Sequence, residues 1–247
     1  QVSKNIQHLE QPIAIKPKLS IVMPVFNVAP YLDACLLSVG SQKYSNFELI
    51  IVNDASTDNS RGIIEMHAAL DSRIKYINLE HNTLGGAGIP SNIGLAAATG
   101  DFVGFVDSDD WIDTDYYASL LHTAERKKLD ITFTSGYFNH RSDSIQTVKY
   151  NSFALKKGNP SLKGYHESFM LWDKVFNTKL IKTHNIRLGE TKAAVDVPFI
   201  AKAYYYAQRM GFSDTYGYHY QRESESSVTV KFRKKSSCEF ELQAFKD

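Results

Sequence analysis

Three carboxylates stand within four positions at the end of an apolar run. Asp107, Asp109 and Asp110 directly follow residues 102–106, whose sequence FVGFV predicts a buried strand. Like charges so close together repel one another, and a divalent cation or a set of polar ligand groups relieves that repulsion. Acidic residues also form ordinary solvated turns. The motif by itself therefore leaves two interpretations open, a metal site and an acidic turn.

Two further polar loops follow predicted strands in the first third of the chain. A strand over 19–23 is expected to stop at Pro24, and others are expected over 47–52 and 74–79. Helices between them complete two βαβ units, which imply parallel strands with right-handed crossovers. Ligands of such sheets bind outside the carboxyl ends of the strands. The loops that should therefore line one crevice are 24–27, 53–58 and 107–110.

A glycine-rich stretch lies between the third strand and the acidic motif, with Gly85, Gly86 and Gly88 close together. Its pattern is neither the dinucleotide fingerprint nor a Walker A loop. Closely spaced glycines let the backbone approach a ligand, but they also form flexible loops that bind nothing. A short helix over 95–99 that stops at Gly100 is expected next.

The second half of the chain carries weaker signals. Thr178 is predicted as the N-cap of a short helix, and Asp196, two residues before Pro198, as the N-cap of another. An Asp is a preferred cap whatever the protein does, so Asp196 has a purely structural interpretation too. The other predicted elements are a helix over 114–128, strands over 130–134 and 215–220, a hairpin or excursion over 136–160, and a terminal helix after a capping box of Ser236 and Glu239.

The composition favours one α/β domain and argues against one class of partner. A chain of 247 residues with 43% hydrophobic residues can bury a core without a disulfide or a metal. The chain has 28 Lys and Arg against 27 Asp and Glu, a net charge of +1. So small a positive charge argues against general electrostatic binding of nucleic acid. Of the two cysteines, Cys35 lies on an apolar helical stretch and is predicted to be a buried free thiol.

No apolar stretch approaches the roughly 20 residues needed to cross a bilayer, and the start of the chain lacks a signal-peptide core. We therefore expect a cytoplasmic protein. It would have an arm or linker over 1–18, a main domain over 19–222, and a basic segment with a helix over 223–247. The basic residues 231–235 leave open a peripheral contact with anionic lipid and an ordinary solvated face. Gln1 in place of Met is compatible with one domain of a longer protein.

The predicted crevice combines acidic residues from two strand ends with a glycine stretch, and it has no lysine of the Walker type. An acidic crevice that binds an anionic phosphate needs a cation as a bridge. Mg²⁺ or Mn²⁺ with oxygen ligands is the hard-cation solution. A nucleoside diphosphate with a divalent metal is thus one physical interpretation of this arrangement.

Several short motifs, taken in order, resemble the family 2 glycosyltransferases of GT-A fold over residues 19–222. Each motif alone is weak, and their order and spacing carry the resemblance. The motifs lie at 21–27, 52–58, 92–94, 105–110, 172–174 and 195–199. The resemblance implies a GT-A type α/β fold, with a Rossmann-like nucleotide-binding half, a mostly parallel central sheet flanked by helices, and an acceptor-side half.

The same resemblance implies an inverting transfer of a sugar from a nucleotide-sugar, most often a UDP-sugar, to a hydroxyl of a glycan or glycoconjugate. The expected setting is polysaccharide synthesis of the bacterial type. Asp109 would coordinate Mn²⁺ or Mg²⁺ on the diphosphate, and Asp107 would face the ribose or the metal. Asp196 falls at the position of the catalytic base. The implied nucleotide contacts are Pro24, Phe26, Asn27, Asp54 and Asn92.

Trp172 and Lys174 border the acceptor if the resemblance extends to that half of the site. The alternative is that Trp172 packs in the core and Lys174 lies on the surface. His219 is either a further metal or phosphate contact or, as is more usual for a lone His in an aromatic strand, a packed side chain.

Two departures from the family pattern bear on activity. Val195 stands where a Glu usually precedes the base, which puts the support of the base in doubt. Ser91 stands where an Arg commonly precedes the Asn, so a diphosphate contact is missing or comes from Arg222 or Lys231.

Two other classes of protein remain as alternatives. A strand that ends in Asp-x-Asp also describes the nucleophile motif of haloacid-dehalogenase-like phosphatases. Trp111, where Thr or Val is usual, and the position of the motif in mid-chain argue against that class. A non-catalytic module that binds a nucleotide-sugar is kept open by Val195 and Ser91.

Overall fold

The structure is a computed structural model, and it describes residues 17–83, 86–150, 169–191 and 194–221. Some of the predicted features lie outside these residues. They are most of the arm over 1–18, Gly85, the later part of the excursion over 136–160, Arg222, Lys231, the basic cluster over 231–235 and the terminal helix with its capping box.

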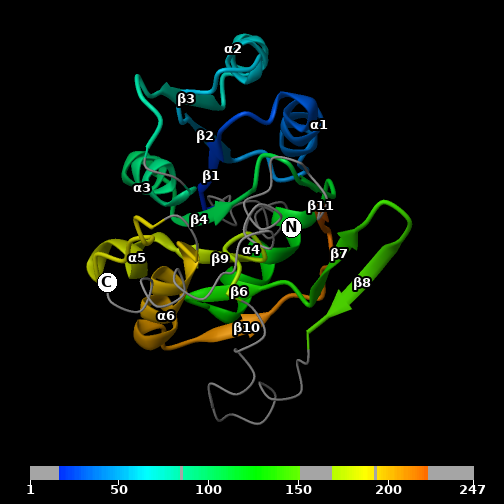
Figure 1. The fold of residues 1–247 in the computed structure, drawn as a ribbon. Helices are drawn as coiled ribbons and strands as arrows, with labels where there is room; N and C mark the ends of the chain where they lie inside the picture. Colours follow the sequence, from blue (N-terminus) through cyan, green and yellow to red (C-terminus); the bar gives the residue numbers. More distant parts are fainter. Residues whose placement is uncertain (1–16, 84–85, 151–168, 192–193, 222–247) are drawn as a thin grey trace, which may run out of the picture.

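The centre of the fold is a seven-stranded sheet with the strand order β10-β6-β9-β4-β1-β2-β3 (Figure 1). Its strands are parallel except β9, which pairs antiparallel with both β4 and β6. The predicted α/β class with a mostly parallel sheet is therefore confirmed. The strands are β1 (Leu19–Val25), β2 (Phe47–Asn53), β3 (Ile74–Asn78), β4 (Phe102–Phe105), β6 (Ile131–Phe133), β9 (Lys174–Asn177) and β10 (Met210–Phe212).

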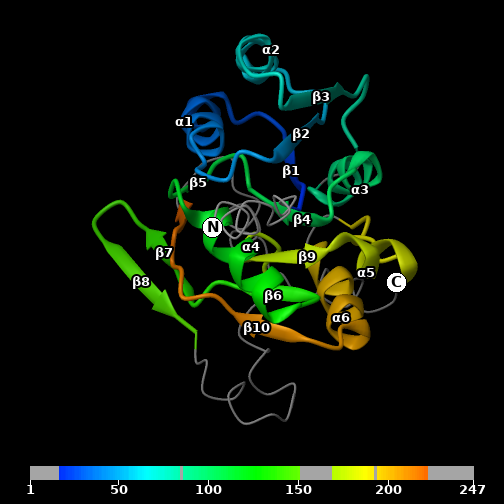
Figure 2. The same ribbon diagram turned by 180° about the vertical axis from the view of Figure 1, so that it is seen from behind.

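Helices cover both faces of this sheet. In Figure 1, α3, α5 and α6 lie to the left of the strands and α1 lies to the right, and the reverse view in Figure 2 agrees. None of the described helices is long and apolar enough to cross a membrane. The helices are α1 (Ala29–Gly40), α2 (Ser60–Leu70), α3 (Gly88–Ala97), α4 (Tyr116–Lys127), α5 (Thr178–Thr183) and α6 (Asp196–Tyr206).

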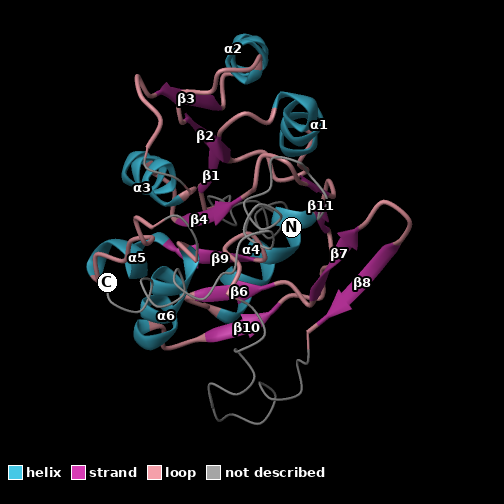
Figure 3. Cartoon of the chain, viewed as in Figure 1, coloured by secondary structure: helices cyan, strands magenta, loops and turns pink. Residues whose placement is uncertain are grey.

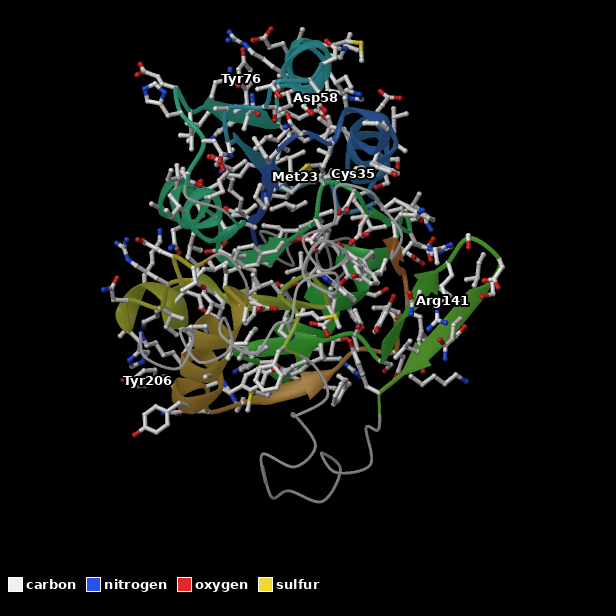
Figure 4. All side chains as sticks on the ribbon, in the orientation of Figure 1. Met23, Cys35, Asp58, Tyr76, Arg141 and Tyr206 are labelled. Atoms are coloured by element: carbon white, nitrogen blue, oxygen red, sulfur yellow. The ribbon has the colours of Figure 1, made fainter. Side chains whose placement is uncertain are left out.

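Alternate residues of the central strands feed two hydrophobic cores, one on each face of the sheet. In β1, Ile21 and Met23 join a core shared with α1 and α4, whereas Val22 joins a core shared with α3, α5 and α6. Met23, on β1, and Cys35, on α1, both belong to the core on this face of the sheet (Figure 4). Cys35 is a buried free thiol, as predicted.

A second, four-stranded sheet with the order β5-β11-β7-β8 stands beside the main one, at the right of Figure 3. Its β7–β8 hairpin, with Arg141 at its turn, confirms the described part of the hairpin predicted over 136–160 (Figure 4). β11 pairs antiparallel with β5 and parallel with β7. The sheet thus brings the end of the described chain beside the acidic motif. Its strands are β5 (Trp111–Ile112), β7 (Gly136–His140), β8 (Ile145–Lys149) and β11 (Tyr218–Gln221).

The prediction that Pro24 stops the first strand was wrong. β1 continues through Pro24 to Val25, paired with β2 as far as Asn53. Pairing between β1 and β4 ends with Val22 and Phe105, so no ladder bond is required on that side of Pro24. A proline is tolerated at such a locally unpaired position because it has no N–H to donate.

The glycine-rich stretch was also misassigned, because α3 begins at Gly88 and includes residues predicted as loop. Pro90 falls in the first turn, where its missing N–H removes no intrahelical bond. A Cβ atom on Gly88 would lie 1.9 Å from the Gly189 carbonyl oxygen, so this glycine allows close backbone packing. Gly100 does not stop the helix, which ends at Ala97, and instead packs against the backbone of Lys18 and Ser20.

Two predicted caps lie one residue away from their observed positions. The N-cap of α5 is Asn177, whose side chain accepts a hydrogen bond from the Lys179 backbone N–H, and Thr178 is the first helical residue. Asp196 is likewise the first residue of α6, after Val195. Its carboxylate therefore lies in the first turn, where the positive end of the helix dipole favours a negative charge.

One buried carboxylate that sequence patterns did not single out connects the central strands. Glu48, on β2, accepts hydrogen bonds from Ser20 on β1 and from both the backbone N–H and the hydroxyl of Thr99. It also pairs with Lys18 at 3.0 Å and Lys75 at 2.7 Å. Burial alone would raise the pKa of Glu48, but the hydrogen bonds from Lys75, Ser20 and Thr99 outweigh it and lower the pKa well below its ordinary value.

We expect Glu48→Gln to lower the free energy of unfolding by about 1.5–3 kcal/mol, because it removes charged hydrogen bonds of a buried group. Folding lowers the pKa of Glu48. Its contribution to the free energy of unfolding is therefore fully present above the pKa of Glu48 in the unfolded chain, and it is lost as the pH falls toward the pKa of Glu48 in the folded protein. Urea unfolding at several pH values measures both effects. Glu65→Gln, which breaks an exposed pair with Arg61, is the matched control and should change little. Equal effects of the two variants would contradict the role given to Glu48.

Candidate active site

The loops that follow β1 and β2 meet at the carboxyl edge of the sheet, as predicted. The side chain of Asn27 accepts hydrogen bonds from the backbone N–H groups of Thr57 and Asp58, and its own N–H donates to the Ser56 hydroxyl. Asn27 has a φ of 52°, a left-handed conformation that Asn adopts more readily than most residues. Pro24 is half-buried just before this junction and Phe26 is 43% exposed. These residues shape one wall of the candidate site.

Asp54, also predicted as a nucleotide contact, is buried with its carboxylate already engaged. One oxygen accepts from the Thr83 backbone N–H at 2.8 Å, and the other accepts from the Thr83 hydroxyl and the Asn82 amide. Asp54 therefore fastens residues 82 and 83 to the end of β2. Its contact with a nucleobase stays a prediction.

The three acids after β4 separate into two kinds. Asp107 and Asp109 remain partly exposed. Asp110 is 1% exposed, and its two carboxylate oxygens accept from the Tyr218 hydroxyl at 2.8 Å and from the Gln221 backbone N–H at 2.7 Å. Asp110 was not among the residues predicted to bind the metal, and in the structure it binds β11.

Asp107 and Asp196 approach each other across the edge of the sheet. Burial, followed by the negative charges of Asp109 and Asp196, raises the pKa of Asp107 to about 7. Asp196, in the first turn of α6, thus lies near the turn that follows β4. The turn after β4 is the segment predicted to bind the metal, and the first turn of α6 carries the predicted catalytic base.

Asp196 lies in an environment that suits a proton acceptor. Burial raises the pKa of its carboxyl, while hydrogen bonds from its own and the Val197 backbone N–H and the positive charge of Lys174 oppose the increase. A carboxylate with a raised pKa accepts a proton more readily near neutral pH. Val195, at the position that raised doubt about support for the base, packs against the core shared with α3, α5 and α6.

Trp172 and Lys174, predicted to border the acceptor, both have buried side chains, and their contact with an acceptor stays a prediction. Trp172 stacks on Tyr218 with ring centroids 4.2 Å apart, which agrees with its alternative as a core residue. Lys174 is fully buried, so its alternative as a surface residue was wrong. It pairs with Asp173 and donates to the Met170 carbonyl, and Asp173 also accepts from the Tyr150 hydroxyl at 2.6 Å.

Asn92 and His219 also have partners within the protein. The Asn92 side chain makes reciprocal hydrogen bonds with the backbone N–H and carbonyl of Leu188, which attaches α3 to the segment before α6. The amide faces Leu188, and the contact of Asn92 with a nucleotide stays a prediction. His219 stacks between Trp111 and Phe138, so the packed alternative is the one observed.

The residues that fit a divalent cation are Asp107 and Asp109. Among the described residues, no group of three or more His, Cys, Asp or Glu side chains is arranged to hold a metal ion alone. Two carboxylates suffice for Mg²⁺ or Mn²⁺ when substrate phosphates and water supply the other oxygen ligands. The crowding of negative charge around Asp107 is the kind of environment that a cation stabilises.

Comparisons with known proteins match this arrangement to one family. The family described as Glycosyl transferase family 2 matches residues 20–191. Among similar proteins, the putative glycosyltransferase EpsH of Bacillus subtilis is 31% identical over 226 residues, covering 89% of this chain and 64% of EpsH. The poly(ribitol-phosphate) beta-glucosyltransferase of Bacillus spizizenii is 29% identical, covering 82% of this chain and 32% of its own length. The chain thus spans less than two thirds of these curated relatives.

The fold also matches a solved structure. S. aureus TarS residues 1–349, crystallised in complex with UDP-GlcNAc, superimposes with a TM-score of 0.75 at 27% identity. The match covers 86% of this chain and 60% of the TarS chain.

We expect Asp107→Asn to stabilise the metal-free protein at pH 8, by roughly 1–3 kcal/mol in the free energy of unfolding. The folded state raises the pKa of Asp107 from 3.8 to about 7, so ionising this group weakens the fold as the pH rises through that range. At pH 5 the folded protein keeps this carboxyl protonated while the unfolded chain is mostly ionised, so roughly a third of the gain seen at pH 8 should remain. Urea unfolding in EDTA at both pH values tests this, with exposed Asp115→Asn as control. A gain at pH 5 as large as at pH 8 would contradict the assignment.

Proposed function

The chain belongs to glycosyl transferase family 2, and from that premise we propose that it transfers a sugar from a nucleotide-sugar, most simply a UDP-sugar, to a hydroxyl of a glycan or glycoconjugate. Its relatives include a poly(ribitol-phosphate) beta-glucosyltransferase and a putative teichuronic acid biosynthesis glycosyltransferase, TuaG of Bacillus subtilis. The observation that carries the proposal is that Asp109 and Asp196 both lie close enough to Asp107, at the carboxyl edge of the sheet, for their charges to raise the pKa of Asp107. TarS supports the donor class, since it is similar over most of this chain and was crystallised with UDP-GlcNAc.

Asp109, together with Asp107, would hold Mn²⁺ or Mg²⁺. When bound, such a cation neutralises the charge that develops on the departing nucleoside diphosphate. The loop built on Asn27 and the half-buried Pro24 would border the nucleotide, because both lie at the carboxyl ends of β1 and β2, where open α/β sheets bind their ligands.

Asp196 would take the proton of the attacking acceptor hydroxyl. The acceptor oxygen forms its bond to the anomeric carbon from the face opposite the diphosphate, as the bond to the diphosphate oxygen breaks. This single displacement inverts the configuration at that carbon. Burial of Asp196 favours the protonated state that follows the transfer, while Lys174 favours the ionised state that precedes it. A positioned base of this kind contributes about 10²- to 10⁴-fold in rate.

Membership of the family overturns the phosphatase alternative. The non-catalytic binding module would bind the same donor as the proposed enzyme, but Asp196 would not act as a base in it. The assay of Asp196→Asn beside the wild type separates these two candidates.

We predict that Asp109→Ala removes the dependence of UDP binding on Mn²⁺, because it deletes one of two protein ligands to the cation. Isothermal titration of UDP with MnCl₂ and with EDTA measures this dependence. Asp115→Ala, which removes an exposed acid just beyond β5, should bind as the wild type does. UDP binding that keeps its Mn²⁺ dependence in Asp109→Ala would exclude the metal role of that residue.

We predict that Asp196→Asn keeps donor binding while the rate of transfer falls about 10²- to 10⁴-fold. UDP release from UDP-glucose, UDP-galactose, UDP-GlcNAc and UDP-GalNAc, with and without candidate acceptor glycans, provides the assay. The exposed residue Asp214 supplies a control through Asp214→Asn. Transfer by Asp196→Asn at near the wild-type rate would remove Asp196 as the base. Donor binding by the wild type with no turnover would favour the non-catalytic module.

A further inference from the structure

The hydroxyl of Tyr218 contacts both ends of the acidic turn. It accepts a hydrogen bond from the Asp107 backbone N–H at 3.1 Å and donates one to the Asp110 carboxylate at 2.8 Å. Tyr218 is fully buried and Asp110 is 1% exposed. One hydroxyl therefore joins the first and the last residue of the turn that carries Asp107 and Asp109.

The carboxylate of Asp110 extends this connection along β11. Its second oxygen accepts from the Gln221 backbone N–H at 2.7 Å, so Asp110 binds both ends of that short strand. β11 also pairs with β5, the strand that begins directly after the turn. The turn is thus closed on one side by β4 and on the other by β5 with β11. A hydrogen bond from the Asp110 N–H to the Asp107 carbonyl, at 3.0 Å, closes it internally.

The ring of Tyr218 has little room to move. It stacks on Trp172 with centroids 4.2 Å apart and planes 11° apart, and it lies 5.9 Å from the ring of Tyr116. Tyr116 in turn donates its hydroxyl to the Trp172 carbonyl at 2.6 Å. The Tyr218 hydroxyl is therefore held at a fixed place relative to the turn, and a phenylalanine could keep the ring packing while losing both hydrogen bonds.

Asp110 is poorly placed to be a third metal ligand. Both of its oxygens already accept short hydrogen bonds, and the side chain is almost completely shielded from solvent. A side chain that hydrogen-bonds to the backbone of a metal-binding turn does not touch the metal itself. It sets the direction in which the metal ligands of that turn point. Without such support, two like-charged carboxylates in a short turn would move apart.

We propose that Asp110 and Tyr218 are positioning residues, which hold the turn so that the carboxylates of Asp107 and Asp109 converge on a cation bound with the nucleotide. This inference rests on the proposed function, since it requires that a nucleotide and a divalent cation bind here. It assigns the third acid of the motif to the support of the site and connects that support to β11, more than 100 residues further along the chain.

Tyr218→Phe tests this inference, with Tyr116→Phe as the matched control. Both substitutions remove one buried tyrosine hydroxyl from the same aromatic cluster, but only Tyr218 contacts the turn. Isothermal titration of UDP in MnCl₂ and in EDTA gives the affinity with and without metal, and circular dichroism checks that each variant is folded. We expect Tyr218→Phe to weaken UDP binding in MnCl₂ by about 10- to 100-fold, the usual effect of losing an outer-shell partner. UDP binding in EDTA should stay unchanged. Asp110→Asn should act in the same direction.

The possible outcomes separate this inference from the proposed function. If the wild type shows no metal-dependent binding of UDP, the proposed function fails and the inference falls with it. If the wild type binds UDP with Mn²⁺ and both Tyr218→Phe and Asp110→Asn do so equally well, only the inference is overturned. An equal loss in Tyr116→Phe would also overturn it, because the effect would then belong to the aromatic cluster and not to the turn.

Discussion

Repulsion between carboxylates is the constraint on which this site depends. Asp107, Asp109 and Asp196 bring negative charge together at one edge of the sheet, and burial, followed by the charges of Asp109 and Asp196, raises the pKa of Asp107 to about 7. Such a cluster is held only if the surrounding fold fixes its backbone. Strand β4 fixes one end of the acidic turn between β1 and β9, and the buried pair of Asp110 and Tyr218 fixes the other. Repulsion between these carboxylates thus destabilises the folded protein without metal, and a bound cation would reduce that repulsion. Functional sites often lower the stability of a fold in this way.

The base side of the site is built on a second set of buried polar groups. Lys174 is completely shielded and pairs with Asp173, which also accepts from Tyr150. The positive charge of Lys174 acts on Asp196, at the start of α6. Buried ion pairs of this kind add little net stability, because desolvation offsets their attraction. Beside the candidate base, the charge of Lys174 opposes the rise that burial causes in the pKa of Asp196.

Local sequence patterns predicted the elements that depend on near neighbours. The apolar runs of β1, β2 and β4 identified those strands, and parallel topology then placed Asn27 and Asp107 at one edge. The errors arose where a distant contact decides the structure. Gly88 resembles a loop glycine, yet its lack of a Cβ allows contact with the Gly189 backbone and so the start of α3. The partner of Asp110 lies 108 residues away, and no periodicity indicates it. The burial of Lys174 depends on its ion pair with Asp173, whose carboxylate also accepts from the Tyr150 hydroxyl, 23 residues away, a partner that sequence patterns do not reveal.

The most direct test of the account is the position of the metal. A crystal of this chain grown with UDP and MnCl₂, with data collected at the manganese absorption edge, would locate the cation by its anomalous signal. We predict a peak at coordination distance from a carboxylate oxygen of Asp109 and from the diphosphate of UDP, with Asp110 still bound to Tyr218. A bound UDP with no manganese at Asp109, or a manganese ion coordinated by Asp110, would contradict it.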